Sequence, residues 1–326
     1  MTPIVRNGHL QTLLGNFWSR PETEVRYPLV RRLYQTDAET QVAADEQLVA
    51  SPVARAVLVH GLEGSSQSGY IRSLSRNLLE AGVSVYRFNM RSCGGTEHLS
   101  KTNYHAGQTS DLRQVITEIR AADPATPLFV IGFSLGGNAS LKLAGELGGQ
   151  KGLVDGVCGV STPLDLARCC DRLNERQNFI YQRRFVAALK GRIRRRHALA
   201  PERYDLEPLV RVHSIWDFDE LYTSKLFGFG TALRYFQTQS AGQYLKAIEM
   251  PCLVIQAKDD PMIPFEVYER EQALHGQNAN IQFLPFETGG HVGFVASRSP
   301  RFWIDPIITR WVLQNRNKTG TSCVRL

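Results

Sequence analysis

One serine lies in a sequence pattern that is typical of an activated nucleophile. Residues 132–137 read GFSLGG, which places Ser134 at the centre of a G-x-S-x-G pattern between an apolar stretch and a helix-forming stretch. A serine at the tip of a tight strand-to-helix turn has a strained backbone, so the residues two positions away must lack side chains that would clash. The N–H groups at the start of the following helix favour negative charge there. The pattern therefore predicts Ser134 as a nucleophile.

Two later segments supply the base and the acid that such a serine requires. A hydroxyl is a weak nucleophile unless a base takes its proton and an acid orients that base. After two further apolar stretches, residues 258–264 read KDDPMIP and residues 288–293 read TGGHVG. The order serine, aspartate, histidine and the D-x-x-x-P spacing lead us to predict Asp260 as the acid and His291 as the base. Asp259 is the alternative acid, and an N-cap role for the Asp pair is compatible with either choice.

A fourth segment is predicted to stabilise negative charge on a carbonyl oxygen. Residues 60–66 read HGLEGSS directly after the apolar stretch AVLVH. A backbone N–H from such a loop and the N–H of the residue after the nucleophile can form an oxyanion hole, typically with about 3 kcal/mol from each donor. We predict Leu62 and Leu135 as these donors. The His-Gly pair alone is typical of a simple turn after a strand, and the other three segments favour the site.

Other reactive residues do not form a recognisable site. The eight histidines have neither H-x-x-x-H nor H-E-x-x-H spacing, so we predict no metal site, and no cofactor is expected. Gly94 and Gly95 lack the GK[ST] ending of a phosphate loop and are interpreted as a tight loop. Cys93 follows no nucleophile pattern and is interpreted as a structural thiol. The last four residues, from Cys323, fit a loose prenylation pattern, but the arginine among them favours a chance match.

The apolar pattern predicts an α/β fold with a mostly parallel central sheet flanked by helices. Short, nearly continuous apolar runs predict strands at 56–60, 83–89, 128–133, 154–160, 252–257 and 281–286. Helices are predicted at 71–81, 109–122, 138–147 and 265–274. Segments 25–34 and 41–49 are candidates for an antiparallel edge.

Strand-like runs are absent between about 162 and 245. We therefore predict a hydrolase core at 1–161 and 246–313, a helical cap at 162–245 and a flexible tail at 314–326. Four aromatic residues of the cap are expected to line an apolar acyl pocket. They are Trp216, Phe227, Phe229 and Phe236.

The composition is that of an ordinary globular protein with one basic segment. The chain has 326 residues and a net charge of +7, of which residues 168–203 carry +8, from eleven Lys/Arg and three Asp/Glu. A basic amphipathic helix within this segment, from Arg183 to Arg196, suggests peripheral contact with an anionic membrane surface. The alternative is a solvated helix face whose apolar stripe packs on the main domain. No nucleic acid is expected, because aromatic and basic residues do not alternate as in single-strand binding grooves.

The same composition bears on the compartment. No apolar run reaches the roughly 18–20 residues of a membrane-spanning helix, and the first eleven residues do not resemble a signal peptide. The six cysteines have no C-x-x-C spacing, which suggests free thiols in a reducing compartment. A cytoplasmic location is expected.

The chain resembles one family of α/β-hydrolases, the YheT-type hydrolases, which are related to plant embryogenesis-associated proteins and animal abhydrolase-domain lipases. The matching motifs are NGHLQT from Asn7, HGLEGSS from His60, NMRSCGG from Asn89, YHAGQTSDL from Tyr104, GFSLGGN from Gly132, WDFDELYTSKLFGFG from Trp216, AKDDP from Ala257 and GGHVGF from Gly289. The resemblance implies the α/β-hydrolase fold and a carboxylesterase or lipase that acts on short- to medium-chain acyl esters without a cofactor. It places the triad on Ser134, Asp260 and His291.

Two other functions are compatible with this sequence. An acyltransferase would use the same acyl-enzyme, with an alcohol in place of water. A non-catalytic protein could bind anionic lipid or nucleic acid through the basic segment, although a serine, an aspartate and a histidine in triad order argue against it. The oligomeric state and the physiological substrate are not predicted.

Overall fold

The centre of the protein is an eight-stranded sheet, seen in a computed structural model that describes residues 2–18, 26–150, 152–275 and 278–317. The strands are β1 (Val30–Asp37), β2 (Thr40–Gln47), β3 (Ala54–Val59), β4 (Val83–Asn89), β5 (Leu128–Phe133), β6 (Gly156–Val160), β7 (Cys252–Ala257) and β8 (Ile281–Phe286). Their order is β1-β2-β4-β3-β5-β6-β7-β8. Strand β2 is antiparallel to β1 and β4, and the remaining pairs are parallel. The predicted α/β class and the antiparallel edge are confirmed.

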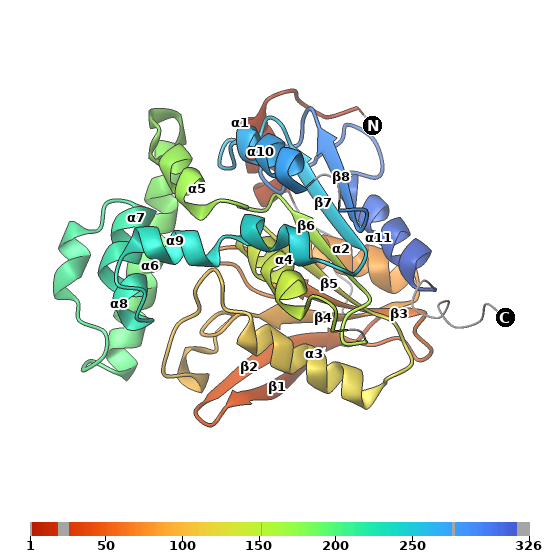
Figure 1. Cartoon of the computed structure of the whole chain (residues 1–326), viewed down its shortest axis with the longest axis horizontal. Coiled ribbons are helices and arrows are strands. Elements are labelled where there is room, and N and C mark those ends of the chain that lie inside the picture. Colours follow the sequence, from red (N-terminus) through yellow and green to blue (C-terminus); the bar gives the residue numbers. More distant parts are fainter. Residues whose placement is uncertain (1, 19–25, 151, 276–277, 318–326) are drawn as a thin grey trace.

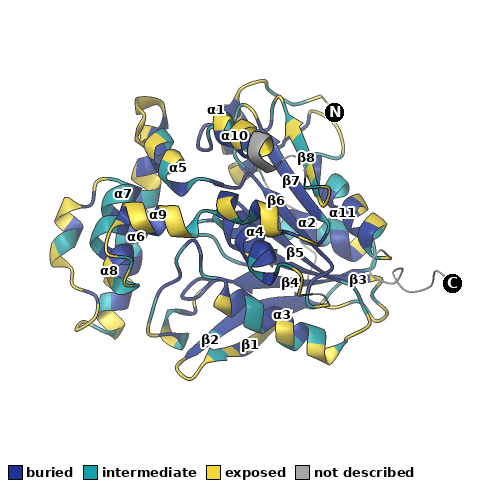
Figure 2. Ribbon diagram, viewed as in Figure 1, coloured by how far each residue is buried: buried dark blue, intermediate teal, exposed yellow. Residues whose placement is uncertain are grey.

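Helices cover both faces of this sheet, so the molecule has three layers (Figure 1). The helices packed on it are α2 (Gly69–Glu80), α3 (Ser110–Ala122), α4 (Leu135–Leu147), α10 (Phe265–His275) and α11 (Ile304–Asn315). Alternate residues of a strand point to opposite faces. In β3, Val57 and Val59 therefore join the core with α3, α4 and α10, whereas Ala56 and Leu58 join a second core with α2 and α11. Strands β2 to β7 are almost entirely buried, as Figure 2 shows in dark blue, whereas the edge strands β1 and β8 are more exposed.

The predicted strand boundaries are accurate in the middle of the sheet. Strands β4, β5, β7 and β8 have the predicted limits, whereas β3 begins at Ala54 and β6 begins at Gly156. The edge strand β1 lies further along the chain than predicted, because most of its residues are exposed and their apolar pattern is weak. Helix α11 was not predicted, and it continues to Asn315, beyond the predicted start of the tail.

The helix α1 (Gly8–Phe17) was also not predicted, and its burial is the reason. Its buried residues are Gly8, Gln11, Thr12 and Gly15, which are small or polar, while most of its leucines and Phe17 face outward. An apolar stripe normally marks the buried side of a helix. Here the stripe points the other way, so the usual pattern gives no signal.

Between β6 and β7 the described residues form helices and turns. The α-helices are α5 (Leu166–Asn174), α6 (Phe179–Leu199), α7 (Ile215–Phe218), α8 (Ser224–Leu226) and α9 (Ala232–Gln239). Figure 1 shows these helices as a green group beside one end of the sheet. Helix α6, with 21 residues, is the longest in the described part of the chain. Within that part, no helix combines the length and the apolar character needed to span a membrane.

Candidate active site

Ser134 occupies the turn between β5 and α4 in a strained conformation. Its φ is 52° and its ψ is −123°, which few residues other than glycine adopt. A Cβ on Gly132 would lie 2.2 Å from the carbonyl oxygen of Gly136, and a Cβ on Gly136 would lie 2.4 Å from the carbonyl oxygens of Val59 and His60. The two glycines of the G-x-S-x-G pattern therefore let the turn pack against itself and against the end of β3. The Ser134 N–H donates to the carbonyl of Val160 at 2.8 Å, which ties the turn to β6.

His291 and Asp260 form a hydrogen-bonded chain with this serine. The distance from His291 Nε2 to Ser134 Oγ is 2.9 Å, and the distance from His291 Nδ1 to Asp260 Oδ2 is also 2.9 Å. The other oxygen of Asp260 accepts from the backbone N–H groups of Met262 at 2.9 Å and Ile263 at 3.1 Å. The side chain of Asp260 is fully buried and that of His291 is 10% exposed. The structure thus brings the three predicted residues together in the order that a serine–histidine–aspartate relay needs.

Asp259, the alternative acid, has a different partner. Its Oδ1 accepts from the backbone N–H groups of Gly289 and Gly290, each at 2.8 Å, whereas the His291 Nδ1 bonds to Asp260. Burial raises the pKa of Asp259. Asp259 therefore anchors the loop that carries His291, while Asp260 faces the imidazole.

Helix α1 holds the histidine loop from the other side. Thr12 Oγ1 accepts from the His291 N–H at 2.8 Å, and Gln11 bonds to both the N–H and the carbonyl of Val295 at 2.7 and 3.0 Å. A Cβ on Gly8 would lie 1.6 Å from the carbonyl oxygen of Asp259, so only glycine permits this approach. Sequence reasoning gave the NGHLQT motif no role. In the structure it positions His291 and the aspartate loop, a function that depends on contacts nearly 300 residues apart.

The two predicted oxyanion donors flank Ser134 at the wall of one cavity. Leu62 and Leu135 both line it, and Leu135 is the first residue of α4, so its N–H has no acceptor within the helix. The loop of Leu62 is held by His60, whose Nδ1 bonds the carbonyl of Gly61 at 2.8 Å and whose Nε2 accepts from the Met90 N–H at 3.1 Å. Burial lowers the pKa of His60 to about 4, which keeps this histidine neutral.

A buried charged network joins the same loop to α6. Glu63, next to Leu62, forms an ion pair with Arg192 of α6. The hydroxyl of Tyr104 accepts from the Glu63 N–H at 2.9 Å and from Arg192 at 2.8 Å, and it donates to the Glu63 carboxylate at 3.3 Å. Helix α6 and the loop of Leu62 are therefore connected by a set of polar contacts among Glu63, Tyr104 and Arg192. No single motif of the sequence indicated this, because Arg192 is one of many arginines in a basic run.

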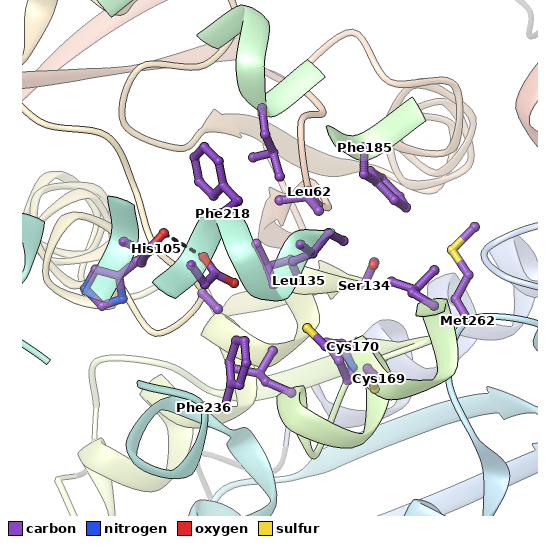
Figure 3. Close-up of a pocket in the computed structure, with 18 of the residues that line it drawn as sticks. Leu62, His105, Ser134, Leu135, Cys169, Cys170, Phe185, Phe218, Phe236 and Met262 are labelled. Carbon is purple, nitrogen blue, oxygen red and sulfur yellow. Dashed lines mark hydrogen bonds between the residues drawn. The ribbon is translucent and has the colours of Figure 1, made fainter. Parts of the chain in front are cut away.

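The cavity above Ser134 is apolar and has a volume of about 760 Å³, including solvent at its mouth. Figure 3 shows Ser134 between Phe185 and Met262 toward one end and Phe218 and Phe236 toward the other. The expectation for the aromatic residues of the cap is only partly correct. Of the four, Phe236 lines the cavity, whereas Trp216 packs behind its ring at 5.0 Å, and Phe227 and Phe229 pack on His105. The spacing of these aromatic residues in the sequence does not show which of them line the cavity and which pack behind the lining.

One carboxyl group lies in this apolar lining. Asp219 begins a short π-helix (Asp219–Thr223), a type of turn that is frequent at functional sites, and Thr223 donates to its Oδ1 at 2.6 Å. Burial raises the pKa of Asp219 to about 7. A group with this pKa is partly protonated near neutral pH, so the cavity contains a polar point that can both donate and accept a hydrogen bond.

Some arginines of the basic segment are buried, and others are exposed. Arg192 and Arg196 are buried, and Arg196 donates to the carbonyl of Ser100 at 2.6 Å. Arg183 and Arg184 are exposed. Arg192 is bonded to Glu63 and the Tyr104 hydroxyl, and Arg196 to carbonyls, so neither guanidinium faces solvent, while peripheral contact of the segment with an anionic membrane surface stays a prediction.

The residues that were not assigned a catalytic role include Cys93 and Gly94. Cys93 is buried, and burial raises the pKa of its thiol. Gly94 lies in a tight loop with a φ of 66°. Among the described residues, no group of three or more His, Cys, Asp or Glu side chains is arranged to hold a metal ion. Cys323 lies outside the described residues.

Comparison with known proteins identifies the family of the chain. Residues 57–296 match the family described as alpha/beta hydrolase fold. The chain belongs to this family. It is 30% identical over 313 residues to the putative esterase YheT of Escherichia coli (strain K12), covering 94% of this chain and 90% of that protein. It is 27% identical over 301 residues to the phospholipase ABHD3 of Mus musculus, covering 89% of this chain and 72% of that protein. The predicted YheT-type relationship is confirmed.

A solved structure agrees on the fold. The esterase Pf2001 of Pyrococcus furiosus superimposes with a TM-score of 0.59 at 16% identity, covering 91% of this chain and 99% of that one. Identity at this level shows the shared fold alone. With the esterase and lipase relatives, the prediction of a carboxylic ester hydrolase is confirmed at the level of the enzyme class.

Proposed function

We propose that the protein hydrolyses short- to medium-chain acyl esters, acylglycerols and phospholipids included, through an acyl-enzyme on Ser134. The observation that carries the proposal is the continuous hydrogen-bonded path from Ser134 Oγ through His291 to Asp260. Ser134 lies in the wall of a concave site that is lined mainly by apolar side chains, as is usual for sites that bind small organic ligands. An apolar lining suits an acyl chain, and the relatives named as an esterase and a phospholipase support this substrate class.

The proposed reaction has two halves. His291 Nε2 takes the proton of Ser134 as its Oγ bonds to the ester carbonyl carbon, and Asp260 stabilises the resulting imidazolium. The Leu62 and Leu135 N–H groups stabilise the tetrahedral oxyanion. As this intermediate collapses, the C–O bond to the alcohol breaks and His291 protonates the leaving oxygen. Water, deprotonated by His291, then attacks the acyl-enzyme and releases the acid with Ser134 regenerated.

Covalent labelling by a fluorophosphonate tests the nucleophile, and a series of p-nitrophenyl esters of increasing chain length tests the substrate class. We expect wild-type protein to be labelled and to hydrolyse the esters, and Ser134→Ala to lose both activities. Cys93→Ala is the matched control and should retain labelling, because its buried thiol takes no part. A folded wild-type protein that neither reacts with small phosphonates nor cleaves any ester would refute the proposal.

Product analysis decides the fate of the acyl group. With ethanol added to the assay, a hydrolase releases mainly free acid, whereas an acyltransferase releases mainly the ethyl ester. Predominant ethyl ester would replace hydrolysis by acyl transfer and leave the role of Ser134 unchanged.

A further inference from the structure

The outer face of α1 is apolar and exposed. Leu10, Leu13 and Phe17 follow the i, i+3, i+7 spacing of one helix face and are 48%, 37% and 75% exposed. The opposite face of the same helix is the one that bonds to His291 through Thr12. A helix that buries glycine, glutamine and threonine and exposes a large apolar stripe is inverted with respect to a normal surface helix. Single exposed apolar residues are common, but a contiguous group marks an interaction surface.

The start of α6, which contacts α1, carries two further exposed apolar side chains. Phe179 and Ile180, the first two residues of α6, are 60% and 72% exposed. The two helices meet directly, because the His9 and Tyr181 rings are stacked with centroids 5.7 Å apart and His9 Nδ1 lies 3.2 Å from the Tyr181 hydroxyl. We define the docking face as Leu10, Leu13, Phe17, Phe179 and Ile180.

Basic side chains lie close in the sequence to the residues of this face, and two of them follow Ile180 at the i+3 and i+4 positions of α6. Arg6, Arg176, Arg183 and Arg184 are exposed, and none forms an ion pair with another described residue. The acidic neighbour in this turn, Glu175, is already paired with Arg172 at 2.9 Å. Exposed apolar groups with exposed arginines nearby in the sequence complement the interface of a bilayer, where acyl chains lie beneath anionic headgroups.

The docking face also lies beside the reaction site. Asn178, one residue before α6, donates to the carbonyl of Pro261 at 2.7 Å, next to Asp260 and Met262. Leu173 near the end of α5 and Phe185 in the second turn of α6 line the cavity above Ser134. An object bound to the docking face would therefore be close to the cavity.

We propose that the docking face binds the surface of an anionic phospholipid bilayer, with its apolar side chains inserted among acyl chains and its arginines against phosphate groups. The contact is peripheral and reversible, because five partly inserted side chains contribute far less than a spanning helix. It uses the outer side of α1 and the first turn of α6, and not the buried arginines at the far end of α6.

Vesicle flotation tests the proposal with the full chain carrying Ser134→Ala, so that no lipid is consumed. The probes are vesicles of phosphatidylcholine alone and of phosphatidylcholine mixed with phosphatidylglycerol. We expect binding to the mixed vesicles that weakens as salt is raised. Phe17→Ser and Ile180→Ser should each weaken this binding at least about tenfold, and Arg183→Gln with Arg184→Gln should weaken it by about fivefold per charge at low salt.

Val210→Ser is the matched control, because Val210 is 73% exposed but belongs to a different turn of the cap (Glu207–Arg211), and it should bind as the parent does. Thermal unfolding checks that each variant is folded. The proposal would be overturned if the protein floated with neither vesicle composition. It would also be overturned if Val210→Ser reduced binding to the mixed vesicles as much as Ile180→Ser does. Light scattering provides the other decisive outcome. A dimer that Phe17→Ser converts to monomers would assign the face to a second copy of this chain and equally overturn binding to lipid.

Discussion

Replacing the two adjacent aspartates separately distinguishes their roles. Asp260 uses one oxygen for the N–H groups of Met262 and Ile263 and the other for His291 Nδ1. In the Asp260→Asn variant the amide retains one acceptor, which the two backbone N–H groups require, so its NH₂ group faces the imidazole. An NH₂ group there donates to Nδ1 and moves the ring proton to Nε2, where it blocks proton transfer from Ser134. In a triad this error lowers kcat by about 10⁴-fold, or about 5.5 kcal/mol.

Asp259→Asn is predicted to be mild for a complementary reason. Both N–H groups that Asp259 binds converge on its Oδ1, which the amide retains. Its Oδ2 is buried with no hydrogen-bond partner among the described residues, and burial raises the pKa of the carboxyl, so a neutral NH₂ group costs little there. We expect kcat within about tenfold of wild type.

The assay is steady-state hydrolysis of a soluble ester at saturating concentration, with the active-site concentration measured by phosphonate titration. The two variants should differ by about 10³-fold or more in kcat, while both have the far-ultraviolet circular dichroism of the parent. If folded Asp259→Asn protein loses as much activity as Asp260→Asn, or if Asp260→Asn remains within about tenfold of wild type, the assignment of the acid is wrong.

Three further substitutions test the supports of the site. Thr12→Val removes the acceptor of the His291 N–H and should lower kcat about tenfold with little change in KM, while Thr12→Ser should retain activity; equal kcat in both variants would contradict the role of α1. Asp219→Asn should become more stable relative to wild type as pH rises from about 4 to 7. The reason is that the folded carboxyl, with its pKa raised from 3.8 to about 7, resists ionisation that the unfolded chain undergoes freely. Urea unfolding should give a gain of up to about 4 kcal/mol that levels off above about pH 7, and a constant difference would refute the burial effect. Gly191→Ala should stabilise α6 by about 0.5–1 kcal/mol, because the added Cβ meets only Arg195 Nη1 at 3.5 Å; a lower melting temperature would contradict this.

The sequence predicts those features that local chemistry determines. The turn at Ser134 needs glycine on both sides, and buried parallel strands such as β5 and β7 need continuous apolar runs, so short segments identify both. The positions of Asp260 and His291 follow because the carboxyl ends of parallel strands meet at one edge of the sheet. Choosing between Asp259 and Asp260 is harder, since adjacent residues differ only in the direction in which the loop points them.

Features that depend on distant contacts were not predicted. Helix α1 presents most of its apolar residues outward. Gln11 and Thr12, on its buried side, form hydrogen bonds with a loop nearly 300 positions away in the sequence. Arg192 looks like its neighbours in a basic run, yet it is buried against Glu63. The residues that line the cavity were hard to predict for the same reason. Trp216 and Phe236 are both aromatic, and only the packing of the folded chain determines that Phe236 lines the cavity.

These distant contacts explain why the site requires nearly the whole chain. A nucleophile and a base contribute to catalysis only if they are held within a few tenths of an ångström of their working geometry. Ser134 is fixed by the sheet itself, but His291 lies on a glycine-rich loop that has little rigidity of its own. Its position is determined by Thr12 from the N-terminal helix and by Asp259 from the preceding loop. The loop of Leu62, the proposed oxyanion donor, is held in the same way by the ion pair between Glu63 and Arg192 of α6. Loss of α1 should therefore reduce kcat even with all three triad residues present, because the histidine would no longer be held against the serine.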